Sequence, residues 1–260
     1  MDARRLVTRL GIGSLLILGA ATTAPLASMA QARMSAPLVA EVNPADFATA
    51  VDHPLFPLAS MPPKVLVGQT TDPATGQITK ERVELRVSPA TEMVAGVEVT
   101  VLEEFGYIDG RLDEHSRDYF AQGKDGTVYL FGERVDHFQD GQLIEQPGTW
   151  LVGQDVPVPF VYLPAELSVG QTFKPEFVPG LAEDVAIVTA LDQSVTTAAG
   201  TFDGCAVLTI QDLAGDVVDR SLCAGVGFVK EALAGDSAGV EDPATGEGPE
   251  GGVELVKLGA

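Results

Sequence analysis

Three Asp-Gly pairs interrupt a long run of β-forming residues, and they constrain the fold more than any other feature. They lie at Asp109-Gly110, Asp125-Gly126 and Asp140-Gly141, between segments dense in Val, Ile, Thr, Tyr and Phe. Such pairs suit two-residue type I′ hairpin turns, whose two central residues both need a positive φ. Similar turn-bounded segments continue to the end of the chain, without a clear helical segment. The sequence therefore predicts an all-β fold, an antiparallel meander that forms a barrel or a sandwich.

The same acidic turns could instead bind calcium. Calcium loops of the EF-hand type supply several oxygen ligands at alternate positions, followed by a Glu. The segments YIDGRL, GKDGTV and FQDGQL each supply one Asp, and DPATGQ and EDPATGEG also fall short. We interpret the turns as hairpin corners and expect no cofactor, with calcium as the alternative.

The first residues have the layout of a secretory signal peptide. Basic residues that include Arg4 and Arg5 precede the apolar stretch GIGSLLILGAA, and small residues follow. We expect cleavage near Ala30, with Ala32 as the alternative, so that residues 1–30 are the signal. The Arg4-Arg5 pair leaves twin-arginine export open beside the general route. No later apolar run is long enough for a membrane span, and the predicted location is periplasmic or extracellular.

Two composition shifts divide the rest of the chain. Residues 31–63 are rich in Pro and Ala and predict an extended segment that docks on the core through Leu55, Phe56 and Leu58. Residues 64–260 carry the antiparallel β pattern. Within them, the Gly-, Asp- and Glu-rich stretch 234–252 predicts a flexible acidic loop.

The net charge of the chain argues against some classes of binding partner. The chain has 16 Lys and Arg against 37 Asp and Glu, and its formal net charge is −21. A field of this sign repels phosphate, which argues against nucleic acids and anionic membranes as partners. We therefore expect the binding partner to be a small ligand or another protein.

The two cysteines flank a predicted hairpin. A three-residue turn at residues 213–215 places Cys205 directly opposite Cys223. Opposed residues of a non-hydrogen-bonded antiparallel pair come within reach of a disulfide, and an exported chain meets an oxidising environment. We predict a cross-strand disulfide.

The hairpin around Asp125-Gly126 has two plausible registers. A two-residue loop places Asp118 opposite Glu133, where two like charges must share a proton, a cation or a basic neighbour. A three-residue loop from Lys124 to Gly126 places Arg117 opposite Glu133 instead, which removes the conflict. Asp118 and Glu133 are therefore candidates for a general acid and base, and the sequence leaves both registers open.

The two-residue register also predicts a ligand-binding face. Besides the carboxylates, this face would carry Phe120, Gln122, Tyr129 and Phe131. Both faces of the hairpin carry apolar residues, so the sheet is covered on both sides or this face lines a cavity for a small ligand.

A row of ionisable residues emerges if all three hairpins have two-residue turns. In this row Glu104 faces His115, His115 faces Asp136, and Asp136 faces Glu145. An imidazole between carboxylates can form a general base or a metal site, with Glu104, His115 and Asp136 as ligands. A solvated sheet face with an ion-paired histidine is the alternative. Motifs of nucleophilic hydrolases, zinc proteases and nucleotide-binding loops are absent from the sequence.

Four segments of the chain resemble a set of uncharacterised secreted bacterial β-rich proteins and lipoproteins. The pattern of that set reads NPYFPLxPGTxWxYxG, then a DWYAQDxxGNVWYFGE-like block, then GxAED and PGVG. The counterparts here are HPLFPLASMPPKVLVG, DYFAQGKDGTVYLFGE, GLAED and AGVG. This chain has Tyr119, Phe120 and Tyr129 at the usual Trp positions, and it lacks the lipobox. The resemblance implies an exported β-rich domain and carries no established activity.

These observations together predict an exported, acidic, non-enzymatic protein that binds a small ligand or a protein partner. One alternative is a cell-envelope hydrolase that uses Asp118 and Glu133. The other is a structural module stabilised by calcium.

Overall fold

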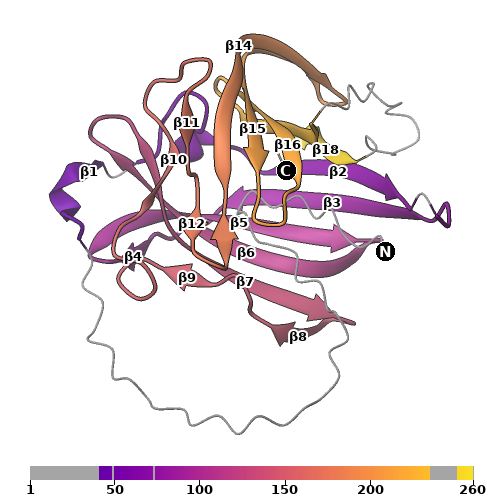
Figure 1. The fold of residues 1–260 in the computed structure, drawn as a ribbon, viewed down its shortest axis with the longest axis horizontal. Coiled ribbons are helices and arrows are strands. Elements are labelled where there is room, and N and C mark those ends of the chain that lie inside the picture. The colour runs from indigo at the N-terminus through magenta and orange to yellow at the C-terminus, as the bar shows by residue number, and fades with distance from the viewer. Residues whose placement is uncertain (1–40, 49, 73, 235–250, 260) are drawn as a thin grey trace, which may run out of the picture.

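A computed structural model of the chain describes residues 41–48, 50–72, 74–234 and 251–259 (Figure 1). The expected signal peptide and most of the predicted acidic loop lie outside these described residues. Within them, no helix is long and apolar enough to cross a membrane.

The described residues form strands almost throughout, with two short 3-10 helices, η1 (Pro44–Asp46) and η2 (Leu58–Ser60). The strands of the first half are β1 (Phe47–Ala48), β2 (Lys64–Thr71), β3 (Ile78–Val87), β4 (Glu92–Val94), β5 (Val97–Ile108), β6 (Arg111–Gly123), β7 (Val128–Gln139), β8 (Gln142–Glu145) and β9 (Trp150–Leu151). Those of the second half are β10 (Phe160–Leu163), β11 (Thr172–Phe173), β12 (Phe177–Val178), β13 (Ala182–Glu183), β14 (Val185–Thr197), β15 (Gly200–Gln211), β16 (Val217–Cys223), β17 (Gly227–Leu233) and β18 (Gly252–Leu258).

One antiparallel sheet of 16 strands carries the fold of the described residues, in the order β10-β7-β6-β5-β3-β2-β18-β17-β16-β15-β14-β11. The strands β1, β4, β8 and β9 pair beside this path, and β12 and β13 form a small second sheet. In Figure 1, β14 to β16 run across β5 to β7, so that the sheet folds over itself. The sheet does not close. The all-β prediction is confirmed, and of its two alternatives the fold is sandwich-like.

The core lies between the two layers and is completed by the segment that precedes β2. Phe56 and Leu58 are buried, and Leu55 packs against the core. The ring of Phe56 lies 4.9 Å from the rings of both Phe120 and Tyr162. The segment thus fills the space between the layers with its own aromatic and aliphatic side chains.

Two of the three Asp-Gly turns are the predicted type I′ corners. Asp109 and Gly110 have φ values of 49° and 78°, and Asp140 and Gly141 have 51° and 77°. Each pair directly joins two strands, since the ladders end at Ile108 opposite Arg111 and at Gln139 opposite Gln142. The hairpin interpretation of these two turns is confirmed.

The third turn combines the two registers that the sequence left open. Near the turn Gln122 pairs with Val128, which is the register of the longer loop. Further along, Asp118 pairs with Glu133, which is the register of the two-residue loop. The switch occurs where Tyr119 pairs with Gly132 and Phe120 with Leu130, so that Phe131 is an extra residue. A β-bulge at Phe131 therefore places the two carboxylates opposite each other.

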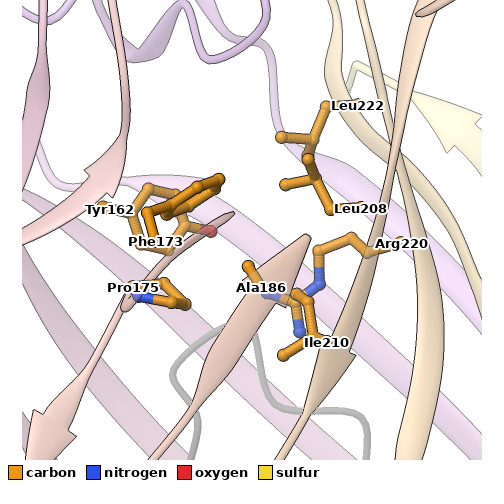
Figure 2. A pocket seen from close by; sticks show the side chains of 8 residues that line it. All are labelled: Tyr162, Phe173, Pro175, Ala186, Leu208, Ile210, Arg220 and Leu222. Carbon is orange, nitrogen blue, oxygen red and sulfur yellow. The ribbon is translucent and has the colours of Figure 1, made fainter. Parts of the chain in front are cut away.

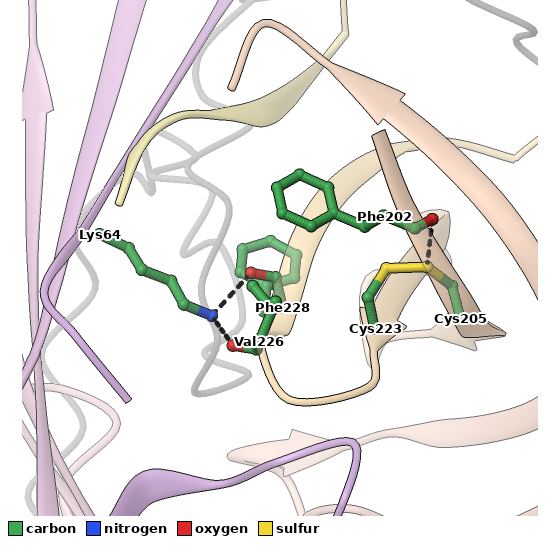
Figure 3. Close-up of a disulfide and its surroundings, with 6 residues drawn as sticks. All are labelled: Lys64, Phe202, Cys205, Cys223, Val226 and Phe228. Atoms are coloured by element: carbon green, nitrogen blue, oxygen red, sulfur yellow. Dashed lines mark hydrogen bonds between the residues drawn. A yellow bond between two sulfur atoms is a disulfide. The ribbon is translucent and has the colours of Figure 1, made fainter. Parts of the chain in front are cut away.

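The predicted disulfide joins Cys205 to Cys223, which are partners in the β15–β16 ladder (Figure 3). Both cysteines are fully buried. The β16–β17 turn that follows Cys223 is held by Lys64, whose ammonium donates hydrogen bonds to the carbonyl oxygens of Val226 and Phe228. Burial lowers the pKa of Lys64 to about 7.

Candidate functional site

The candidate site is a set of carboxyl groups buried between the two layers. Its centre is the pair Asp118 and Glu133, whose side chains are 0% exposed. Both carboxylate oxygens of Asp118 lack a hydrogen-bond partner. Burial, and then the negative charges of Glu133, Glu104 and Glu114, raise the pKa of Asp118 well above its usual range, while Arg220 acts in the opposite direction. Burial and the neighbouring negative charges therefore favour the neutral form of the Asp118 side chain.

Glu176 joins this pair from the loop between β11 and β12. It is 0% exposed, and the indole N–H of Trp150 donates a hydrogen bond to its Oε1. Trp150 is itself the ladder partner of Glu133, so the indole links the loop to the pair. Burial and the charge of Glu133 raise the pKa of Glu176 well above its usual range. We call Asp118, Glu133 and Glu176 the carboxyl cluster.

The opposite layer contributes a cation, Arg220 of β16. Its Nε donates a 2.7 Å hydrogen bond to Oε2 of Glu231, and both side chains are 4% exposed. Asp184 lies nearby, and burial raises its pKa to about 7 although Arg220 lowers it. Burial raises the pKa of Asp118 and of Asp184 and outweighs the lowering effect of the charge of Arg220 in both groups.

A small pocket lies beside Arg220. In Figure 2, Tyr162, Phe173 and Pro175 face Leu208, Arg220 and Leu222 across it, and Ala186 and Ile210 complete the lining. Its free volume is about 10 Å³, which is room for roughly one water molecule. The lining includes no member of the carboxyl cluster.

The predicted ligand-binding face is wrong in its composition. Because of the bulge, Phe120 and Gln122 share a face with Asp118, whereas Tyr129 and Phe131 point to the other side and pack edge-on against Phe47. The ring of Phe120 is covered by Phe56 and Tyr162.

The side chain of Gln122 forms hydrogen bonds within the chain, to the segment that precedes β2. Its side-chain oxygen accepts hydrogen bonds from the backbone N–H groups of Asp52 and His53, at 2.8 and 3.0 Å. Its side-chain nitrogen donates to Asp52 Oδ1 at 3.0 Å. The four candidate residues thus divide between two packed faces of the hairpin.

The predicted row of Glu104, His115 and Asp136 is also corrected. A register shift near Leu112 moves β5 by one residue, so that Glu104 pairs with Ser116 and turns inward. His115 pairs with Asp136 as expected, and Asp136 is not opposite Glu145, which pairs with His137.

The outer face instead places Glu103 beside His115. The Glu103 Oε1 and His115 Nε2 atoms are 3.5 Å apart, and the imidazole stacks on Phe105 at 4.2 Å. Arg117 donates a 2.7 Å hydrogen bond to Asp136. Burial and the charge of Arg117 lower the pKa of His115. An ion pair of this sheet face is therefore Arg117 with Asp136, and the lowered pKa of His115 favours a neutral imidazole beside Glu103. Among the described residues, no group of three or more His, Cys, Asp or Glu has a metal-binding arrangement.

Sequence patterns missed Glu176, Asp184, Arg220 and Glu231 as interior residues. A signal was available for Arg220, because the correctly predicted β15–β16 register places it opposite the buried Leu208. No comparable signal marks Glu176, which lies in a loop that only the folded sheet brings to Trp150.

Comparison with known proteins finds no family model that matches the chain, and no curated protein or solved structure with significant similarity.

Proposed function

We propose that this chain is an exported, non-enzymatic protein that binds a protein partner through the open edge of its sheet at β8. The observation that carries the proposal is the exposure of Leu143 and Ile144, which are each 53% exposed on this strand. Within the described part of the chain, β8 pairs with β7 on one side only. An edge strand with exposed apolar side chains is a template for adding a strand from another chain.

The charge around β8 indicates which segment would fit. Asp140 and Glu145 flank Leu143 and Ile144, and the whole chain is strongly acidic. Successive residues of a strand point to opposite faces, so Leu143 and Ile144 offer one apolar contact on each face. The partner segment is therefore extended, with apolar residues that cover these two side chains and basic residues at its ends.

A photo-crosslinking amino acid at position 143 tests this proposal in the cells that export the protein. We expect a crosslinked product with one partner, identified by mass spectrometry, and none from the matched control at Leu213, which is 41% exposed in another turn. A synthetic segment of that partner should bind the purified protein, and L143D with I144D should weaken binding at least about tenfold. Equal crosslinking at both positions, or binding that survives both substitutions, would refute the proposal.

Small-ligand binding is less well supported. Phe120 packs on the chain's own aromatic side chains, and Gln122 bonds to its backbone. The pocket beside Arg220 has room for about one water molecule. An edge strand needs no preformed cavity, which favours a protein partner.

One observation supports the alternative function, a hydrolase that uses Asp118 and Glu133, and one observation argues against it. Asp118 has the raised pKa of a general acid and lies opposite a second carboxyl group. Both groups are 0% exposed, however, and a general acid must come within hydrogen-bond reach of its substrate. A hydrolytic activity of the purified protein that D118N abolishes without loss of folding would establish this alternative.

The calcium-stabilised module remains the third candidate. The acidic surface supports it in a general way. Two of the Asp-Gly turns, however, have the compact geometry of hairpin corners with a single Asp each. Unfolding midpoints that fall in the presence of a chelator would favour this module.

A further inference from the structure

The outer face of the first layer carries a row of charged residues across four neighbouring strands, β3, β5, β6 and β7. Arg86 pairs with Glu103, Glu103 with Arg117, and Arg117 with Arg134. The four strands run side by side in the sheet (Figure 1). Opposed residues of neighbouring antiparallel strands lie on the same face. We call these four residues the arginine row.

The arginine row faces solvent. Successive residues of a strand point to opposite faces. Asp118, which follows Arg117, and Glu133, which precedes Arg134, are buried between the layers, so the row points away from the core. The side chains of Arg86 and Arg117 are 56% and 30% exposed, and Arg134 is exposed as well. A partner in solution can therefore reach the guanidinium groups.

Two arginines of the row stand directly opposite each other. Like charges at opposed positions of two strands destabilise the pair. Arg117 donates a 2.7 Å hydrogen bond to Asp136, whereas Arg134 has no carboxylate partner within the part of the chain that the structure describes. An anion that lies between Arg117 and Arg134 would remove the conflict between their charges.

Aromatic rings hold two of the guanidinium groups in place. Cζ of Arg86 lies 4.3 Å from the ring centre of Phe105, and Cζ of Arg134 lies 5.9 Å from that of Tyr119. Nε of Arg86 also donates a 2.9 Å hydrogen bond to Glu103, and a guanidinium has five N–H donors in all. Guanidinium groups fixed in this way lose little conformational entropy on binding, and their paired N–H groups match the two oxygens of a carboxylate.

The length and charge of the row limit the kind of anion that fits it. Three Arg and one Glu give the row a formal charge of +2, on a chain with a net charge of −21. A long polyanion would extend beyond the row over an acidic molecule, which repels it. Neighbouring strands are about 4.8 Å apart, so the row is about 14 Å long from Arg86 to Arg134. An extended peptide advances about 13 Å over four residues, so acidic residues at its first, third and fifth positions match this length.

We propose that the arginine row binds a short, extended, acidic segment of another protein, with carboxylates at alternate positions that contact Arg86, Arg117 and Arg134. The arginine row is separate from β8, and its binding is independent of the partner proposed for that edge.

Binding of a labelled Glu-Thr-Glu-Thr-Glu peptide to the purified protein tests this proposal, by fluorescence anisotropy at low ionic strength. We expect the wild type to bind and R134Q to weaken binding at least about tenfold. The matched control is R111Q, which removes an exposed arginine that lies 3.6 Å from Asp140 and outside the row. Its affinity should stay within about twofold of the wild type, because distant exposed charges are screened. R134Q should also unfold at a temperature no lower than the wild type, since it removes the pair of like charges.

Four outcomes would overturn the proposal. The first is a wild-type protein that does not bind the peptide, a result that depends on no variant. The second is equal binding of a Gln-Thr-Gln-Thr-Gln peptide, which would show that carboxylates are not recognised. The third is an equal loss of affinity in R134Q and R111Q, which would assign binding to the overall charge. The fourth is a sulfated polysaccharide that binds through Arg134 more tightly than the peptide, which would make the partner a different class of molecule.

Discussion

Asp118 and Glu133 are direct partners across the β6–β7 ladder, and one extra residue, Phe131, sets this pairing. The turn at Asp125-Gly126 alone would have placed Arg117 opposite Glu133 and satisfied both charges. The bulge shifts the strand by one position, opposes the two acids and turns them into the core. A single extra residue thus places two buried acids opposite each other.

Gly132 should be indispensable for this bulge. Its φ is 152°, and a Cβ there would lie 2.6 Å from both the carbonyl oxygen of Trp150 and Cδ2 of Leu151. We expect G132A to lower the free energy of unfolding by about 3–5 kcal/mol, measured by denaturant titration. G141A is the matched control, because Gly141 also has a positive φ but open space around its Cβ position. It should cost about 1 kcal/mol, and equal losses in the two variants would contradict the steric role of Gly132.

Glu81 should make the protein less stable as the pH rises. Burial, with a smaller effect of Glu231, raises its pKa to about 8 although the Thr70 hydroxyl lowers it. Since the folded pKa exceeds the unfolded value of about 4.3, the stabilisation present in acid disappears as the pH passes through 8. E81Q should equal the wild type near pH 4 and exceed it at pH 9 by on the order of 3 kcal/mol in denaturant titrations.

Glu84 is the control for Glu81, on the same strand but with its side chain 37% exposed beside Arg82. E84Q should change the free energy of unfolding by less than about 1 kcal/mol at either pH. A stability gain in E81Q that is the same at pH 4 and pH 9 would refute the titration of Glu81.

Gln122 should fasten the segment that precedes β2. Its side chain makes three hydrogen bonds to Asp52 and His53. Q122M keeps the length of the side chain but removes these bonds, so we expect a loss of about 2–3 kcal/mol. Hydrogen exchange should accelerate first at residues 50–58. If Q122M instead weakened a bound ligand without changing exchange there, Gln122 would be a binding residue after all.

The disulfide should stabilise the protein by closing a loop. Cys205 and Cys223 are separated by 18 positions, and both are buried. The double variant C205A/C223A should lose about 3 kcal/mol of unfolding free energy. Thermal unfolding of this variant should not respond to a reductant, whereas that of the wild type should. A variant as stable as the wild type would show that β15 and β16 need no covalent link.

Turn chemistry predicted most of the strand pairing in this chain. The turn before Asp216 set the β15–β16 register through to the cysteines, because that hairpin has no bulge. The Asp-Gly turns likewise set the nearest pairs of their hairpins. Bulges then shifted the more distant pairs. The bulge at Phe131 depends on the close approach of its neighbour Gly132 to Trp150 and Leu151, which no local sequence pattern contains.

The interior acids were the harder part to predict. Asp and Glu are ordinarily surface residues, so an alternating pattern assigns them to solvent. The pairing of Asp118 with Glu133 could be considered from the hairpin register. Glu176 and Asp184 lie in loops, where no register argument applies, and both are buried. Glu176 and Asp184 are buried because the sheet folds over itself. Contacts between the two layers depend on the position of every strand, so no local sequence pattern predicts them.

The protonation of Asp118 is the most direct test of the account, because it reports both its burial and its pairing with Glu133. The measurement is a pH titration of the side-chain carboxyl carbons by NMR, with the Asp118 signal assigned by its loss in D118N. We expect a carboxyl group that titrates well above the usual range of an Asp side chain, because it is buried beside Glu133. A signal that titrates near pH 4, as an exposed Asp does, would contradict the buried pair.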